Sequence, residues 1–211
     1  VDGAVEFEAH LDRQISEASG YDFITGWVGD NALSVVANSS DQHVRIPGNM
    51  KPHSIAVHPA PDLSVGIAWQ SPLNTSVHIE GLVQHAHPEC GNGVAWTLEH
   101  RRGNTRQTLA HGKAHGAAEN SIGAVEGFPI KKGDAICLVI SPQNGNHSCD
   151  LTHVELTLRS ENQQWRMSDD LSPSLLEGNP HADSFGNPSV WHFFSEPADR
   201  PPGSVIPSGS L

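Results

Sequence analysis

Residues 75–84 read TSVHIEGLVQ, and this stretch decides the fold class. Its odd positions from 77 to 83 hold Val, Ile, Gly and Val, whereas its even positions hold His, Glu, Leu and Gln. A period of two is typical of a strand with one face buried and the other in water. Such half-buried strands belong to antiparallel sheets, so the stretch predicts an antiparallel sheet with one solvated face.

The same alternation recurs at residues 94–99 (VAWTLE) and 153–158 (HVELTL). Further strand candidates lie at 33–37, 54–58, 63–70, 106–111 and 134–141, and the last is apolar enough to be a central strand covered on both faces. Turn sequences such as Pro47-Gly48-Asn49 and Asn144-Gly145-Asn146 separate them. Strands at this spacing predict an all-β, antiparallel β-sandwich or jelly roll around a single core.

Two regions depart from this pattern. Glu6–Ser19 is the segment that best fits a helix, although it could equally begin as a strand. The alternation dissolves near residue 160, so we expect a jelly-roll module at 1–160 and an irregular, extended tail or linker at 161–211 that leads to a following domain. The tail still holds Trp165, Trp191 and Phe193, so we expect it to pack along the sandwich, and Val190–Phe194 could add an edge strand.

Composition excludes several kinds of partner. The 211 residues include 12 Lys and Arg against 24 Asp and Glu, a formal net charge of −12. Nucleic acid is an unexpected partner because its phosphates attract clustered Lys and Arg. No apolar run is long enough to predict a membrane span. The 14 histidines have an unperturbed pKa near 6.5, so we expect the net charge to move toward neutral as the pH falls through about 6.

Two polar loops hold similar residues, QHAHPECGNG at 84–93 and QNGNHSCD at 143–150. Each joins two predicted strands, so they can meet if they lie at the same end of the sandwich. A Cys90–Cys149 disulfide would stabilise the fold by on the order of 4 kcal/mol, and Cys137 would be left as a buried thiol. Unpaired thiols remain an alternative. So does a transition-metal site, because imidazole and thiolate suit zinc and copper; its ligands would be His85, His87, Cys90, His147 and Cys149.

Calcium is a further candidate because it prefers oxygen ligands. Asp150, together with Glu6 or Glu8 from the first segment, could supply carboxylates. The tail sequence NPHADSFGN at 179–187 is also rich in oxygen ligands, with ordinary turn formation as its alternative explanation.

Catalytic motifs are missing from the sequence. It has no Gly-x-Ser-x-Gly elbow, no His-Glu-x-x-His helix and no Walker loop, and no Cys-x-x-Cys-His motif that would attach a haem. Hydrolysis of glycosides by two carboxylates stays open. The sequence therefore favours a binding module over an enzyme.

The five tryptophans suggest sugar binding, since an exposed indole can stack on a sugar ring. Trp69 and Trp96 lie on apolar strand faces and are expected in the core, whereas Trp27 lies between glycines and is the best candidate for an exposed platform. Polar groups for the sugar hydroxyls would come from the two loops: His85, His87, Glu89, Asn92, Asn146 and His147.

Several segments resemble one family. HSIAVHP at 53–59, WQSP at 69–72, HAHPECGNGVAW at 85–96 and GNHSCDLT at 145–152 are similar to the β-sandwich region of large planctomycete cytochrome-c-like proteins. Residues 179–187, 190–193 and 206–211 look like the stretch that leads into the C-terminal domain of the same proteins. The resemblance implies an exported, multidomain polypeptide and a sandwich similar to carbohydrate-binding modules. Such modules often hold a structural calcium between an early Glu and a late Asp, which Glu6 or Glu8 and Asp150 would match.

These observations lead to one expectation and two alternatives. We expect a non-catalytic, polysaccharide-binding module of an exported protein, with a structural calcium and no haem in this segment. A domain that packs on neighbouring haem domains without binding sugar is the first alternative. A histidine-lined metal site with a redox or hydrolytic role is the second. Exposure of the tryptophans distinguishes the first two, because a sugar platform needs an indole that faces a groove.

Overall fold

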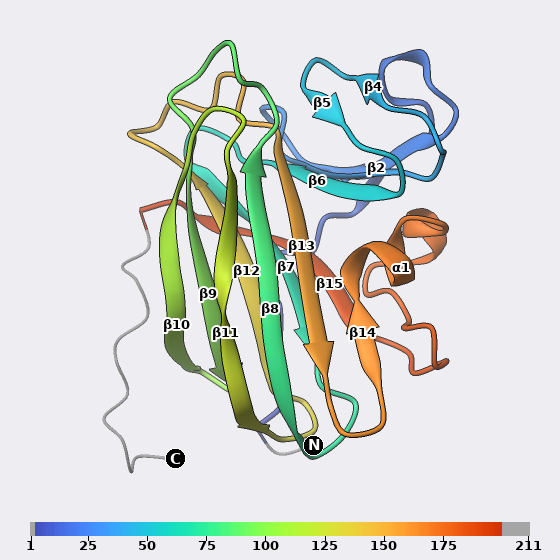
Figure 1. Ribbon diagram of the computed structural model, residues 1–211, viewed down its shortest axis with the longest axis vertical. Coiled ribbons are helices and arrows are strands. Elements are labelled where there is room, and N and C mark those ends of the chain that lie inside the picture. The colour runs from blue at the N-terminus through green and yellow to red at the C-terminus, as the bar shows by residue number, and fades with distance from the viewer. Residues whose placement is uncertain (1–2, 200–211) are drawn as a thin grey trace.

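A computed structural model describes residues 3–199 as two antiparallel sheets stacked face to face (Figure 1). Sheet A has the strand order β10 (Thr105–Ala114), β9 (Val94–Arg102), β12 (Ala135–Pro142), β7 (Leu63–Gln70) and β15 (Trp191–Pro197). Sheet B has the order β1 (Arg13–Ile15), β2 (Ile24–Val28), β3 (Ser34–Asn38), β6 (Ser54–His58), β13 (Thr152–Arg159), β8 (Thr75–His85) and β11 (Glu119–Ile130), and β14 (Gln164–Arg166) also pairs with β13. The all-β sandwich expected from the sequence is confirmed.

Small elements complete the described chain. Strands β4 (Val44–Arg45) and β5 (Asn49–Met50) form a hairpin, and short helices follow β1 and β14: η1 (Ala18–Gly20), α1 (Met167–Leu171) and η2 (Leu175–Glu177). Between residues 3 and 199, no helix combines the length and the apolar character needed to cross a bilayer.

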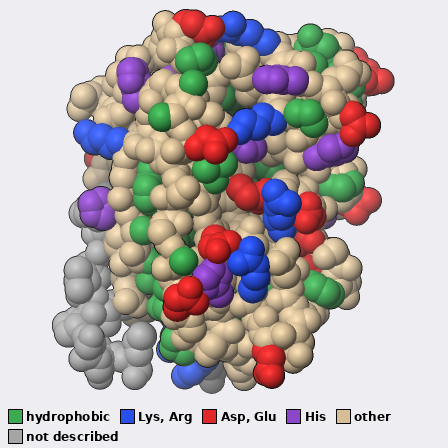
Figure 2. All heavy atoms as spheres, viewed as in Figure 1, with side chains coloured by type: hydrophobic (Ala, Val, Ile, Leu, Met, Phe, Trp, Pro, Cys, Tyr) green, Lys and Arg blue, Asp and Glu red, His purple; other side chains and the backbone are tan. Residues whose placement is uncertain are grey.

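Strand β8 shows how the alternation builds the core. Val77, Ile79 and Val83 are at most 1% exposed and pack in the cluster that both sheets share, while His78 and Glu80 point outward. On the outer face of sheet B, His78 contacts Glu80 at 2.9 Å. Figure 2 shows this face, where acidic, basic and histidine side chains are interspersed rather than uniformly negative.

Strand β12 is buried on both faces, as its apolar sequence predicts. Ile136 and Leu138 face the shared core, whereas Cys137 and Val139 lie in a second cluster on the outer face of sheet A, where Val5 from the N-terminal segment covers them. This outer cluster explains how a strand with no polar alternation is accommodated at the centre of a sheet.

Residues 5–11 do not form the expected helix. They run beside β15, where the Ser195 backbone N–H donates to the Ala9 carbonyl and the Leu11 N–H donates to the Phe193 carbonyl, both at 3.0 Å. These inter-segment bonds satisfy backbone groups that a helix would have satisfied internally, and the rest of the segment forms β1 and η1.

The expected boundary at residue 160 is wrong for the described part of the chain. Strand β14 pairs with β13, β15 forms one edge of sheet A, and Trp165 and Trp191 are fully buried in the shared core. Residues 161–199 are therefore part of the sandwich rather than an extended tail, and the possible edge strand at Val190–Phe194 is confirmed as β15. The remaining tail residues that we predicted to be a linker lie outside the described range.

Candidate functional site

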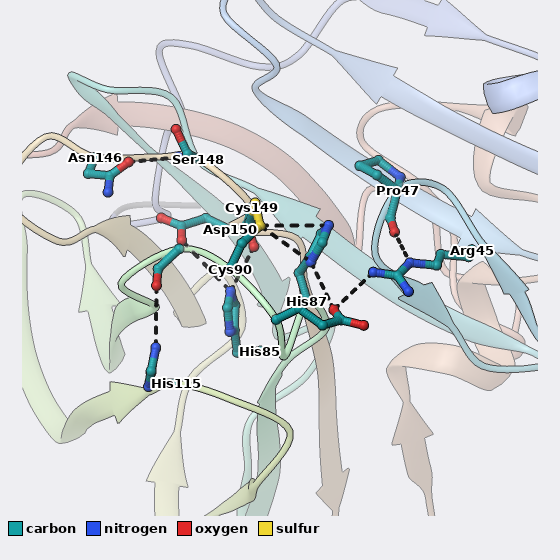
Figure 3. Close-up of a disulfide and its surroundings, with 12 residues drawn as sticks. Arg45, Pro47, His85, His87, Cys90, His115, Asn146, Ser148, Cys149 and Asp150 are labelled. Carbon is teal, nitrogen blue, oxygen red and sulfur yellow. Dashed lines mark hydrogen bonds and ion pairs between the residues drawn. A yellow bond between two sulfur atoms is a disulfide. The ribbon is translucent and has the colours of Figure 1, made fainter.

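The two polar loops meet at one end of the sandwich, where a disulfide joins Cys90 to Cys149 (Figure 3). The two Cα atoms are 5.9 Å apart and the cysteines are 59 residues apart in sequence. Cys137 is free and buried, as expected, and desolvation raises its pKa to about 12. Of the three alternatives for the cysteines, the disulfide is the one that the structure contains.

Backbone pairing brings the loops together. Strands β8 and β13 place His85 opposite Thr152, and the Ala86 N–H donates to the Leu151 carbonyl at 2.7 Å. At Gly91 the loops touch, since a Cβ there would lie 2.5 Å from the Ser148 carbonyl oxygen, and its φ of +84° also favours glycine. The disulfide therefore links loops that sheet pairing already holds in contact.

Asp150, at this end of the sandwich, is a buried carboxyl group in an unusual environment. Its side chain is 0% exposed, and neither carboxylate oxygen has a hydrogen-bond partner among residues 3–199. Desolvation raises the pKa of Asp150 to about 7. A buried carboxylate without partners is costly, so this position requires a proton or a cation to be stable.

His85 is the nearest titratable neighbour of Asp150. Its Nε2–H donates to the Cys149 carbonyl at 2.7 Å and lies 3.9 Å from Asp150 Oδ1. The donated proton leaves Nδ1 as an acceptor, and no group in the described chain donates to it. Desolvation lowers the pKa of His85, so the ring stays neutral at neutral pH and does not neutralise the carboxylate.

The carboxylate of Asp150 is the kind of ligand that a hard cation prefers. The Asn92 side-chain oxygen, from the loop linked to that of Asp150, is also buried without a partner in the described range, and Ca²⁺ prefers carboxylate and amide oxygens. The expected early glutamates do not take part. Glu6 and Glu8 line a hollow with Gly103 and Asn104, which follow β9, whereas the disulfide-linked loop that holds Cys90 precedes β9. Their expected role beside Asp150 is therefore wrong, because the N-terminal segment attaches near the start of β12 and not beyond its end.

The other loop residues predicted to bind a sugar contact one another. Glu89 is 2.9 Å from Arg45 and 3.3 Å from His87, and the Asn146 side-chain oxygen accepts from the Ser148 N–H at 3.0 Å (Figure 3). The ring of His147 packs edge-on against His58, with centroids 5.9 Å apart. These contacts hold the loops in place, so their polar groups are largely engaged within the protein.

Burial also changes the pKa values of several histidines. Desolvation lowers the pKa of six of the described histidines, to about 4 for His153 and His192: His10, His58, His85, His100, His153 and His192. The expectation that the histidines gain charge together near pH 6 is therefore wrong for these six.

All five tryptophans are buried, between 0% and 8% exposed. Trp27, expected as an exposed platform, lies in β2 at 7% exposure, and its indole N–H donates to the Leu175 carbonyl at 2.8 Å. Its flanking glycines mark a strand whose backbone is closely packed, since a Cβ at Gly26 would lie 2.7 Å from a Val36 methyl. The platform assignment is wrong because the ring faces inward.

A groove of about 360 Å³ lies on the outer face of sheet A, over β9, β10 and the end of β15. Thr97, Glu99, Arg106, His111 and Lys113 contribute to its lining. Trp96 reaches its wall from the core side, where it packs under Gly112; a Cβ at 112 would lie 2.6 Å from the indole. The groove thus combines polar side chains with one aromatic edge.

Two acidic and two basic side chains form a network in this groove and beside it. Arg101 and Arg106 each contact both carboxylate oxygens of Glu196, at 2.8 to 3.3 Å, and Arg101 Nε donates to Glu99 at 2.8 Å. Burial disfavours the ionised form of Glu196, but the hydrogen bonds and positive charges of the arginines outweigh burial and lower its pKa. Glu196 therefore stays ionised, and its ion pairs with the two arginines hold the charged side chains in fixed positions.

The sequence contained a signal for half of this groove. Ala95, Thr97 and Glu99 alternate with the buried Val94, Trp96 and Leu98, so their outward direction follows from the period of two. The contribution of Glu196 has no local signal, because β15 reaches sheet A from about 90 residues away in sequence. Comparison with protein-family models finds no match, and neither a curated protein nor a solved structure is significantly similar to the chain.

Proposed function

We propose that this chain is a non-catalytic, polysaccharide-binding module whose ligand lies in the groove of sheet A. The observation that carries the proposal is a groove on a solvent-facing sheet whose lining combines apolar surface with charged and hydroxyl side chains. Fixed ionic groups and the hydroxyls of Thr97 and Thr108 are the kinds of donors and acceptors that recognise sugar hydroxyls. The volume of the groove also falls within the range of small-molecule sites.

The mode of binding differs from the one that the sequence led us to expect. With every tryptophan buried, recognition rests on hydrogen bonds rather than on stacking over an exposed indole. Trp96 Nε1 and Thr108 Oγ1, at the groove wall, have no partner within residues 3–199. Buried polar atoms are seldom unpartnered, and a ligand hydroxyl or a water that reached these atoms would satisfy them.

The module would act by proximity. We propose that it belongs to an exported multidomain protein of the cytochrome-like kind that its sequence resembles, and that it tethers the neighbouring domains to polysaccharide. The disulfide supports an oxidising compartment. A structural calcium would be held by Asp150 and Asn92 rather than by Glu6 or Glu8, and would tie the linked loops together.

Affinity electrophoresis and calorimetry on a panel of plant and marine glycans test the proposal. Thr97→Trp would fill the groove from a solvent-facing strand position, and we expect it to abolish binding. Ser121→Trp places the same ring on the exposed face of β11 in sheet B and serves as the matched control. Failure of the unmodified protein to bind any glycan would reject the proposal, and equal binding by Thr97→Trp would place the ligand elsewhere.

A structural domain without sugar binding is the second candidate. The burial of all five tryptophans favours it, because none of them is exposed for stacking on a sugar ring. It predicts no retention on any glycan and a change in the stability of neighbouring domains when this module is removed from the full polypeptide.

A further inference from the structure

The disulfide-linked loops hold a second potential site, independent of the groove. His87 lies beside the disulfide, with Nδ1 3.5 Å and Nε2 3.9 Å from Cys90 Sγ (Figure 3). One ring nitrogen of His87 and the sulfurs of Cys90 and Cys149 all lie within 4.8 Å of one another. In the oxidised protein the two sulfurs are bonded to each other and are poor ligands.

We propose that reduction of Cys90–Cys149 converts this group into a Cys₂His site for a thiophilic divalent metal ion such as Zn²⁺. An external thiol reductant passes two electrons and two protons to the disulfide, which becomes two thiols, while the reductant is oxidised to a disulfide. Binding of the metal then displaces the two thiol protons, so that two thiolates and the neutral imidazole coordinate it. The fourth position would be left to water or to the adjacent carboxylate of Glu89, which is 3.3 Å from His87.

The ligand spacing suits one tetrahedral ion. Zinc–sulfur bonds of about 2.3 Å and zinc–nitrogen bonds of about 2.0 Å place neighbouring ligand atoms about 3.5 Å apart. His87 Nδ1 is already 3.5 Å from Cys90 Sγ, and the two sulfurs, which are bonded to each other in the oxidised protein, need to separate to about 3.8 Å after reduction. The three side chains are half-buried, so both a reductant and a metal ion can reach them from solvent.

Contacts other than the disulfide keep the cysteines close after reduction. The Ala86 N–H bonds to the Leu151 carbonyl, and His85 bonds to the carbonyl of Cys149 itself. Asn92 and Gln143 exchange two hydrogen bonds across the loops, each 2.8 Å long. These contacts restrain both thiols before a metal arrives, which lowers the entropy cost of assembling the site.

The experiment uses untagged protein and Co²⁺ as a spectroscopic substitute for Zn²⁺. One sample stays oxidised, and the other is reduced with a phosphine, which takes up the oxygen of one water as the two thiols form. We expect one Co²⁺ per chain in the reduced sample, with thiolate-to-cobalt charge transfer and the intense visible bands of a tetrahedral site, and no such bands in the oxidised sample.

Variants identify the ligands. His87→Ala should weaken binding by at least the roughly 10- to 100-fold that changes in outer-shell residues cost in other metal sites. His147→Ala removes another half-buried histidine of the same loops, and Cys137→Ala removes the buried thiol; both should bind as the unmodified chain does.

Three outcomes would overturn the proposal. These are equal Co²⁺ binding by the oxidised protein, unchanged affinity in His87→Ala, and loss of the β-sheet circular dichroism on reduction. None of them bears on glycan binding, which oxidised protein tests separately.

Discussion

Two buried aspartates lie just beyond the two ends of β12, and they have opposite environments. Asp134 precedes the strand at 2% exposure and accepts hydrogen bonds from Arg102 Nε and Nη2, His100 Nε2 and the Lys131 N–H, at 2.7 to 3.1 Å. Asp150 follows the strand by one loop at 0% exposure, and within the described chain no group donates to it. Burial disfavours ionisation of both carboxyls. The donors around Asp134 outweigh burial and lower its pKa, whereas Asp150 has a pKa of about 7.

This difference separates a structural carboxylate from a candidate ligand. The counter-charge of Asp134 is Arg102 in β9, and the carboxylate also accepts from the Lys131 N–H in the turn before β12. Asp150 has no built-in counter-charge, so a proton or a bound cation must supply it. Equal burial of the same residue type therefore has opposite consequences, and the end of the sandwich that holds the disulfide is the one where an added ion changes stability.

Replacing Asp134 should have the largest effect. Asp134→Asn keeps the shape of the side chain but leaves the Arg102 guanidinium and the His100 N–H facing an amide. Removing one partner of a buried ion pair costs about 3 to 5 kcal/mol. We expect a loss of that size in the free energy of unfolding, measured by urea denaturation at pH 7. The exposed Asp169→Asn is the control, and a loss below 1 kcal/mol would contradict this account of Asp134.

Replacing Asp150 should have the opposite effect and raise the free energy of unfolding at pH 7 and above. Its pKa is raised from 3.8 to about 7 in the folded state, so the folded protein holds a proton that the unfolded chain releases. Stability from this group is therefore lost as the pH rises from about 4 to about 7. Without divalent cations, we expect Asp150→Asn to match the unmodified protein near pH 4 and to be more stable above pH 7, by at most about 4 kcal/mol.

The Asp150→Asn variant also tests whether a calcium ion binds at this carboxylate. If Asp150 and Asn92 hold Ca²⁺, adding it at pH 8 should raise the melting temperature of the unmodified protein and leave that of Asp150→Asn unchanged. The exposed Asp22→Asn should respond as the unmodified protein does. An equal response in Asp150→Asn would exclude this calcium site, while the pH dependence without calcium would still test the burial of the carboxylate.

The sequence predicted the strands that have a simple pattern. The bounds expected for β6 and β7 agree with the structure, and β8 differs by one residue at its end. Strand β11 was missed because its pairing with β8 is interrupted by two irregularities, after Ile122 and after Val125, which break the period of two. Strand β2 has no such signal, because Gly26 and Gly29 bracket Trp27 and glycine is depleted in strands.

The sequence is enough to predict that the two cysteine loops can meet at one site. It is not enough to predict which side chains contact one another within that site. The alternation predicted that both loops end strands, which is enough to allow the disulfide. Whether a buried Asp meets a cation depends on which side chains face it from other strands, and Arg102 and His100 reach Asp134 only through the register of β9 against β12. Glu6 and Glu8 were misplaced for the same reason, because the path of the N-terminal segment is set by its tertiary contacts with β15.

The smallest effect should come from the histidine beside Asp134. His100→Gln removes one of four donors, so we expect a loss of about 1.5 kcal/mol in the free energy of unfolding at pH 7 and a rise in the pKa of Asp134, measured by NMR titration of its carboxyl carbon.

The same variant should also change the pH dependence of stability. Desolvation lowers the pKa of His100, so stability from its burial is present above about pH 6.5 and is lost as the pH falls. The unfolding free energy of His100→Gln should therefore fall less steeply between pH 7 and pH 5. The exposed His43→Gln is the control. If both variants keep the pH dependence of the unmodified protein, His100 is not what couples the Asp134 end of the sandwich to pH.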